Sequence, residues 1–203
     1  MKKACLVFLA LLATVFCASA QNDDFGTWTD IQCSHSWDRI YTSLRMEYRS
    51  KGDATATDLW FVRPTLGVKL TPWLKADIAY DLMGKPSGML HRGLFSLTAT
   101  LRQGPLSVSV RERYILGYNV AGNTISHVLR SQLKAQYAIP GSRFAPYLAV
   151  ELFIWEHWQK TRHYVGTDLE VQDWLTLDIF YLYHTIDGQP AQHIAGLGAH
   201  FKI

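Results

Sequence analysis

Residues 129–137 read LRSQLKAQY, and this stretch decides the fold because polar and apolar residues alternate along it. Neighbouring side chains of an extended strand point to opposite faces. One face therefore carries Arg130, Gln132, Lys134 and Gln136. The other carries Leu129, Leu133, Ala135 and Tyr137. A sheet that is apolar outside and charged inside requires lipid as its outer solvent, and only a closed barrel leaves no backbone group unpaired there. The stretch therefore predicts a strand of an outer-membrane β-barrel.

The same alternation recurs to the end of the chain. It predicts strands at 26–34, 39–50, 56–71, 73–83, 91–103, 106–118, 126–139, 144–156, 159–172, 174–186 and 191–203. Tight turns are expected at 71–72, 104–105, 140–142 and 172–173. Longer loops are expected between them, at 51–56, 84–90, 120–125, 157–160 and 187–191. Outer-membrane barrels pair short periplasmic turns with longer external loops, so this order places the end of the last strand in the periplasm.

A parity rule bears on the number of strands. Two termini in the periplasm require an even number, whereas eleven candidate strands are present. The predicted fold is a single all-β, antiparallel, up-and-down transmembrane barrel of ten strands, with twelve as the alternative. In the ten-stranded version, residues 26–34 form a plug or an extra edge strand beside the barrel.

Residues 1–20 have the parts of a cleaved secretory signal peptide: Lys2 and Lys3, an apolar run, and small residues before Gln21. Residues 21–203 then form one barrel domain in the outer membrane. Cys33 is the lone cysteine of this domain, so no internal disulfide is expected. Of the 20 Lys and Arg and the 17 Asp and Glu, only Lys2 and Lys3 fall in the signal peptide. The remaining charges are nearly balanced and form no basic block, which argues against nucleic-acid binding.

Aromatic residues gather near the predicted strand ends, where the two membrane interfaces of a barrel carry aromatic girdles. Beside the tight turns lie Trp37, Trp73 and Trp174. Near the longer loops lie Tyr48, Trp60, Tyr118, Trp155, Trp158 and Tyr183. A soluble core also uses aromatic residues, but it would not sort them to the strand ends.

The polar faces of the strands predict a charged lumen. Its expected members are Arg45, Glu47, Arg49, Arg63, Arg111, Arg113, Arg130, Glu151 and Arg162. One interpretation is a salt-bridged lumen too narrow to conduct, because the planar fork of arginine can bridge two carboxylates. Removal of Arg113 or Arg130 would then leave lumenal carboxylates without a counter-charge. A second is an anion-attracting constriction, because arginines outnumber acids. A third is a substrate pocket.

The residues predict no catalytic, metal or cofactor site. Ser126 and His127 are adjacent and therefore point to opposite faces, while His184 and Asp178 lie about 20 Å apart along one strand. Three histidines near predicted loops match no compact metal-ligand spacing: His91, His157 and His163. The chain has no Gly-rich phosphate loop, HExxH or GxSxG motif.

Several short motifs follow one another in a recognisable order. They are Trp28, Glu47-Tyr48-Arg49, Arg63-Pro64, Arg111-Glu112-Arg113, Glu151-Leu152-Phe153, Arg162 with Tyr164 and Gly166, and Tyr181-Leu182-Tyr183. In these motifs the chain resembles the family known as domain of unknown function 2490, small outer-membrane barrels of Gram-negative bacteria. The resemblance implies the fold and the location over nearly the whole mature chain. It implies no established activity.

The expected role is that of a non-enzymatic outer-membrane barrel serving envelope structure, assembly or a small-solute path. Outer-membrane lipids are the expected partners, together with the barrel-insertion machinery, because the last strand alternates up to Phe201 and Ile203. The oligomeric state is left open. One alternative is a lipid-modifying barrel enzyme with a triad assembled across strands. Another is a soluble periplasmic, lipocalin-like barrel that binds an apolar ligand, with Leu133 and Tyr137 inside.

Overall fold

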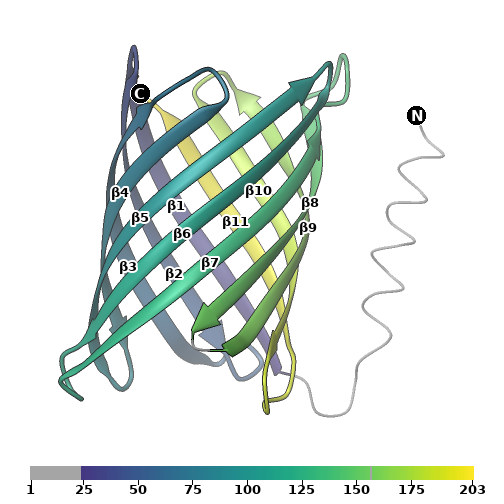
Figure 1. Cartoon of the computed structure of the whole chain (residues 1–203). Coiled ribbons are helices and arrows are strands. Elements are labelled where there is room, and N and C mark those ends of the chain that lie inside the picture. Colours follow the sequence, from purple (N-terminus) through teal and green to yellow (C-terminus); the bar gives the residue numbers. More distant parts are fainter. Residues whose placement is uncertain (1–23, 156) are drawn as a thin grey trace.

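The computed structural model describes residues 24–155 and 157–203, which form a closed β-barrel (Figure 1). The described residues form β1 (Asp24–Trp37), β2 (Ile40–Lys51), β3 (Ala56–Lys69), β4 (Leu74–Lys85), β5 (Gly88–Gln103), β6 (Leu106–Asn119), β7 (Thr124–Tyr137), β8 (Phe144–Trp155), β9 (His157–Gln172), β10 (Leu175–Ile186) and β11 (Gln192–Lys202). The expected signal peptide, residues 1–20, lies outside the described part. No helix in the described residues is long and apolar enough to cross a membrane.

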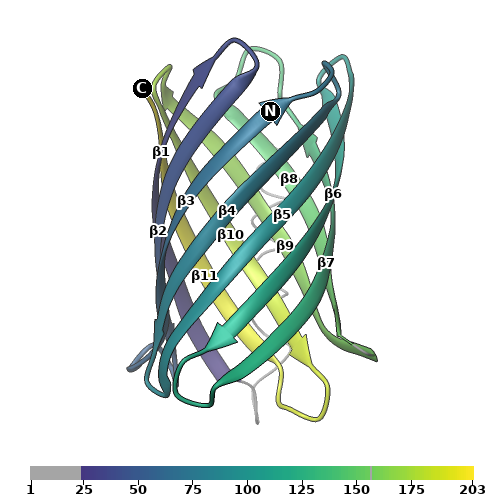
Figure 2. The same ribbon diagram turned by 60° about the vertical axis from the view of Figure 1, so that its left-hand side comes forward.

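The barrel closes between its first and last strands, which run parallel to each other (Figure 2). Their register extends from Asp24 opposite Gln192 to Ser34 opposite Lys202. All other neighbouring strands pair antiparallel in chain order, and β1 pairs antiparallel with β2 on its other side. The wall therefore has no unpaired edge strand, as a closed barrel requires.

The prediction of ten or twelve strands is wrong, because the described residues form an eleven-stranded barrel. Residues 26–34 belong to β1 and are part of the wall, not a plug or an extra edge strand. The parity rule assumes that every pair is antiparallel, and the parallel seam between β1 and β11 removes that condition. β1 also helps to fill the lumen, since Trp28 and Asp30 are only 7% and 9% exposed.

The odd strand number places the two ends of the described chain at opposite ends of the barrel (Figure 1). Asp24 lies beside the connections that follow even-numbered strands, and we call this the Asp24 end. Ile203 lies beside the connections that follow odd-numbered strands, and we call this the Ile203 end. The expectation that both ends of the barrel chain face one compartment therefore fails for Asp24 and Ile203.

The predicted contrast between tight turns and longer loops is also wrong. Only Pro86 and Ser87 separate β4 from β5, where the sequence predicts a loop over 84–90, and β9 already begins at His157. At the Ile203 end, by contrast, β7 and β8 are joined by residues 138–143. The cause is strand pairing that continues up to the turn, as in the opposed residues Lys85 and Gly88. Loop length therefore gives no orientation for this barrel.

The outer wall of the barrel is apolar. Leu133 and Tyr137 face outward and are 53% and 45% exposed, so the lipocalin-like arrangement with these residues inside is wrong. At the Ile203 end the outer wall exposes Trp37, Trp73 and Trp174. At the Asp24 end Trp60 is exposed, while the side chains of Trp155 and Trp158 lie outside what the structure describes. An apolar wall between aromatic residues is the surface that a bilayer covers.

Part of the lumen is filled by apolar side chains from the strands on both sides of the seam. Trp28, Leu182 and Ile194 form a buried cluster, with Phe180 and Tyr164 packed against it. Gly196 lies opposite Phe180, and a Cβ at this glycine would collide with the phenyl ring. The glycine thus lets the ring lie across β11, and the charged residues occupy the remaining part of the lumen.

Candidate functional site

Strand alternation positions the charged lumen. Inward-facing residues occur at every second position, so one strand supplies Arg111 and Arg113 and its neighbour supplies Arg130, Gln132 and Lys134. Antiparallel register then brings the strands' inward residues to matching heights, with Arg113 opposite Arg130 and Glu151 opposite Gln132. Neighbouring residues on the same strands, such as Leu133, face outward.

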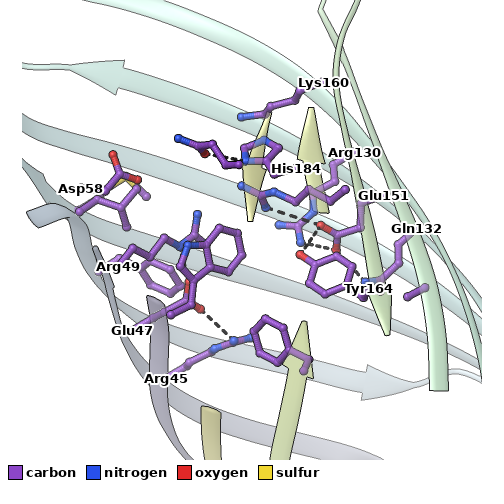
Figure 3. Close-up of a pocket in the computed structure, with 18 of the residues that line it drawn as sticks. Arg45, Glu47, Arg49, Asp58, Arg130, Gln132, Glu151, Lys160, Tyr164 and His184 are labelled. Atoms are coloured by element: carbon purple, nitrogen blue, oxygen red, sulfur yellow. Dashed lines mark hydrogen bonds and ion pairs between the residues drawn. The ribbon is translucent and has the colours of Figure 1, made fainter. Parts of the chain in front are cut away.

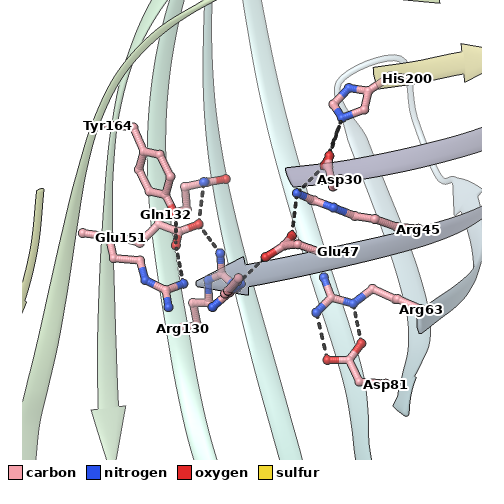
Figure 4. A network of polar contacts seen from close by, with 12 residues as sticks. Asp30, Arg45, Glu47, Arg63, Asp81, Arg130, Gln132, Glu151, Tyr164 and His200 are labelled. Carbon is pink, nitrogen blue, oxygen red and sulfur yellow. Dashed lines mark hydrogen bonds and ion pairs between the residues drawn. The ribbon is translucent and has the colours of Figure 1, made fainter. Parts of the chain in front are cut away.

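Glu151 on β8 is the centre of the largest polar network (Figure 4). Its side chain is 1% exposed and forms ion pairs with Arg130, with Arg111 at 3.2 Å and with Arg162 at 3.6 Å. Gln132 Nε2 and the Tyr164 hydroxyl also donate hydrogen bonds to this carboxylate, at 2.7 and 3.1 Å. Three guanidinium groups therefore share one carboxylate, and the network as a whole carries an excess of positive charge.

Glu47 on β2 forms a second network with the arginines two residues before and after it. Arg45 lies 2.8 Å and Arg49 2.5 Å from its carboxylate oxygens. Arg45 also forms a 2.7 Å ion pair with Asp30 of β1, and the His200 imidazole lies 3.2 Å from Asp30 (Figure 4). This network connects β11, β1 and β2 across the parallel seam.

Asp81 on β4 forms a third network with Arg63 and Arg92. Arg63 makes a two-pronged contact, with Nε 2.5 Å from Oδ1 and a second nitrogen 2.8 Å from Oδ2. Arg92 also donates to Asp81 through two nitrogens, and its Nε bond measures 2.9 Å. The carboxylate is fully buried. A guanidinium group that donates to a carboxylate through two nitrogens forms the strong, directional kind of charged hydrogen bond, and Asp81 accepts from two such groups.

Arg113 belongs to the predicted charge cluster, but it stands apart from the carboxylate networks. It is 7% exposed, and its Nε donates a 2.8 Å hydrogen bond to the Ser96 hydroxyl. Among the described residues, no carboxylate lies within ion-pair distance of it. The charge of the buried Asp77 does attract Arg113, so the expectation that its removal leaves a lumenal carboxylate without a counter-charge stays a prediction. The other eight predicted residues all line one cavity.

The structure adds residues to the site that the sequence does not predict. Asp30 falls in the segment predicted as a plug or an edge strand, and Arg92 lies two residues beyond the predicted loop 84–90. The sequence does contain a signal that could have placed Arg92 in the lumen. Arg92 and Ser96 are four residues apart on one predicted strand, so their side chains share a face. Trp28 is only a motif residue in the sequence, yet its indole ring contacts two guanidinium groups, with Arg49 at 3.7 Å and Arg162 at 4.7 Å from the ring centroid.

Two cavities of the lumen are lined by described residues. The first has a volume of about 540 Å³, and Arg49, Arg130 and Lys160 are among the residues that line it (Figure 3). It reaches the Asp24 end, where Lys51, Lys85 and Gln189 line it. Of the described residues around it, eleven are Lys or Arg and four are Asp or Glu. The second has a volume of about 550 Å³ and reaches the Ile203 end, where Pro105 and Lys202 line it. The first cavity therefore concentrates positive charge.

A polar layer divides the two cavities, which have no lining residue in common. Arg45 at the floor of the first cavity is linked through Asp30 to His200 of the second. Lys134 of the first cavity lies 3.6 Å from Asp168 of the second. We call Asp30, Arg45, Lys134, Asp168 and His200 the dividing layer. It separates the lumen into two vestibules that face opposite ends of the barrel.

Within the described residues, no group of three His, Cys, Asp or Glu side chains is arranged to hold a metal ion. His184, which shares β10 with Asp178, contacts the Gln192 side chain at 3.2 Å. His127 contacts the Tyr114 hydroxyl at 2.6 Å. These contacts are those of packed polar residues on two different faces of the wall.

Comparison with solved structures finds the same barrel fold in the NanC porin, determined in a rhombohedral crystal form. The match has a TM-score of 0.53 and 16% sequence identity, and it covers 83% of this chain and 90% of the porin chain. At this identity the likeness concerns the fold alone. The comparison with curated proteins finds no match. The family model described as a protein of unknown function, DUF2490, matches residues 25–194. The chain thus belongs to the DUF2490 family, as its motifs predicted.

Proposed function

We propose that this protein is a non-enzymatic barrel of the outer membrane whose lumen is a narrow path for small anionic solutes. The observation that carries the proposal is the excess of eleven basic over four acidic residues around the cavity at the Asp24 end. The excess remains when Asp30, Asp81 and Asp168, which pair with four of the basic residues from outside the lining, are added. A vestibule lined by one sign of charge and walled by low-dielectric protein raises the local concentration of the opposite ion. The porin-like fold and the apolar outer wall support a membrane location.

The dividing layer limits what such a path admits. Its ion pairs, Arg45 with Asp30 and Lys134 with Asp168, lie between the two cavities and narrow the path there. We therefore expect a small conductance and exclusion of large solutes. The contacts of His127 with Tyr114 and of His184 with Gln192 support a non-enzymatic role, because neither bond joins an imidazole to a serine, threonine or cysteine.

The proposal is tested by the reversal potential of the protein in planar bilayers that separate two concentrations of KCl. We expect chloride to permeate better than potassium, and Lys85→Glu at the mouth of the first cavity to reduce this preference. Lys69→Glu is the matched control, because its ammonium group contacts the Asp38 carbonyl at the other end, away from both cavities. A preference for potassium, or no flux through folded barrels, would contradict the proposed path.

A further inference from the structure

Three tyrosine–histidine pairs on the outer wall have no part in the proposed solute path. They are Tyr80–His91, Tyr114–His127 and Tyr181–His193. The ring centroids are 6.0 Å apart in each pair, and the interplanar angles are 39°, 37° and 35°. In every pair the histidine lies on the next strand, opposite the residue two positions after the tyrosine. The wall thus repeats one geometric arrangement on three hairpins.

A hydrogen bond holds each imidazole in place. The Tyr114 hydroxyl lies 2.6 Å from His127 Nδ1, and the Tyr80 hydroxyl contacts His91 Nδ1 in the same way. We assign the phenol as the donor, so the proton of the neutral imidazole is on Nε2. The exposed Tyr48 and Tyr118 on the same wall differ, since their hydroxyls bond Thr57 and Asn123, both at 3.0 Å. In the tyrosine–histidine pairs the partner is instead an imidazole, whose second ring nitrogen is a donor on the far side of the ring.

The histidines of two pairs lie near the Asp24 end, since His91 and His127 each come three residues after the first residue of their strands. Toward the middle of the wall, Ile78 precedes Tyr80 on the same face and is 56% exposed, and Leu129 follows His127 and is 42% exposed. On the other side, Leu116 and Ile125 are also exposed, at 45% and 63%, before the turn at residues 120–123. If acyl chains cover the apolar wall, lipid headgroups lie at the height of the histidines. The hydrogen-bond acceptors at that height are phosphate and ester oxygens.

We propose that His91 and His127, oriented by Tyr80 and Tyr114, bind the phosphate group of membrane lipids at the Asp24 end of the barrel. The Nε2–H groups donate to the phosphate oxygens, and the acyl chains of the same lipids lie along the apolar wall below. A hydrogen bond to a charged acceptor is stronger than one to an ester or to water, which favours phosphate over an uncharged headgroup. The inference rests on the proposed membrane location and is independent of the solute path.

Native mass spectrometry of the protein folded in detergent micelles tests the inference. The probes are phosphatidic acid and diacylglycerol with identical acyl chains, which differ only in the phosphate. We expect phosphatidic acid to be retained about ten-fold better, and this preference to fall several-fold in His91→Leu/His127→Leu. Leucine suits a lipid-facing wall, so this variant should fold. His91→Gln/His127→Gln should keep part of the preference, since the glutamine amide lies near the position of Nε2.

The matched control is His35→Leu, which removes a histidine that contacts the Ile203 carbonyl at the opposite end of the barrel. It should bind phosphatidic acid like the unchanged protein. Excess inorganic phosphate should not displace the lipid, because the acyl chains add contacts that the free ion lacks. Equal retention of the two lipids, or an unchanged preference in the double leucine variant, would overturn the inference. A protein that also fails to enter bilayers would overturn the membrane location itself.

Discussion

At the scale of single residues, the lumen is organised by three acceptors, Glu47, Asp81 and Glu151, each shared by at least two arginines. Such sharing costs less side-chain entropy per contact than isolated pairs, because one carboxylate orients several forks. It also makes the stability of the barrel sensitive to the loss of any one of these carboxylates. Loss of one carboxylate leaves several buried guanidinium groups facing one another without a counter-charge.

Glu151→Gln therefore should lower the free energy of unfolding by about 3–5 kcal/mol, the usual cost of breaking a buried charge pair, and by less where lumenal water reaches the arginines. The measurement is urea-induced unfolding in detergent micelles, followed by tryptophan fluorescence. Arg113→Ala is the contrasting variant, since Arg113 donates to the Ser96 hydroxyl and shares none of the three acceptors. Equal losses for the two variants would show that packing, not charge pairing, holds the lumen together.

At the scale of elements, the β6–β7 hairpin shows one departure from the apolar outer wall. Glu112 lies near the middle of β6, between the outward-facing Val110 and Tyr114, and accepts a 2.5 Å hydrogen bond from the Ser131 hydroxyl of β7. A carboxylate facing the middle of a bilayer is unfavourable. The sequence contains this residue in the run Arg111-Glu112-Arg113, but only the alternation of inward arginines identifies it as outward.

We expect Glu112→Leu to stabilise the barrel in a bilayer by about 1–2 kcal/mol, because it removes a charge from the lipid-facing wall. Glu112→Gln keeps the size of the side chain and a hydrogen bond to Ser131. Its stability should lie between that of the unchanged protein and that of Glu112→Leu. Unfolding in lipid vesicles measures both changes. A less stable Glu112→Leu variant would mean that a partner, not lipid, covers this part of β6.

At the scale of the whole molecule, eleven strands and a parallel seam place Asp24 and Ile203 at opposite ends. This topology differs from that of an even-stranded barrel in a way that surface labelling can detect. If the barrel gained or lost one strand at its start, Asp24 would lie on the other side of the membrane. Every later connection would stay on the same side as before.

Cysteine labelling in intact cells tests the topology, with Cys33 replaced by serine and a membrane-impermeant maleimide as the reagent. Asp24→Cys and Gly122→Cys should react alike, and Ser142→Cys should behave in the opposite way, because residues 120–123 and 138–143 join strands at opposite ends. Reaction of Asp24→Cys together with Ser142→Cys would contradict the eleven-stranded closure. The two outcomes differ whichever end of the barrel faces the outside of the cell.

The sequence by itself determined the barrel class, the inward and outward faces, and eight of the nine members of the predicted lumenal cluster that line one cavity. Side-chain alternation is a local property of extended chains, so Leu133 and Lys134 could be assigned to opposite faces from their own strand alone. Only the tertiary structure decided the strand number, the seam, the dividing layer and the absence of Arg113 from the three carboxylate networks. These features depend on register and closure between residues as distant as Asp30 and His200, and alternation does not encode which strands become neighbours.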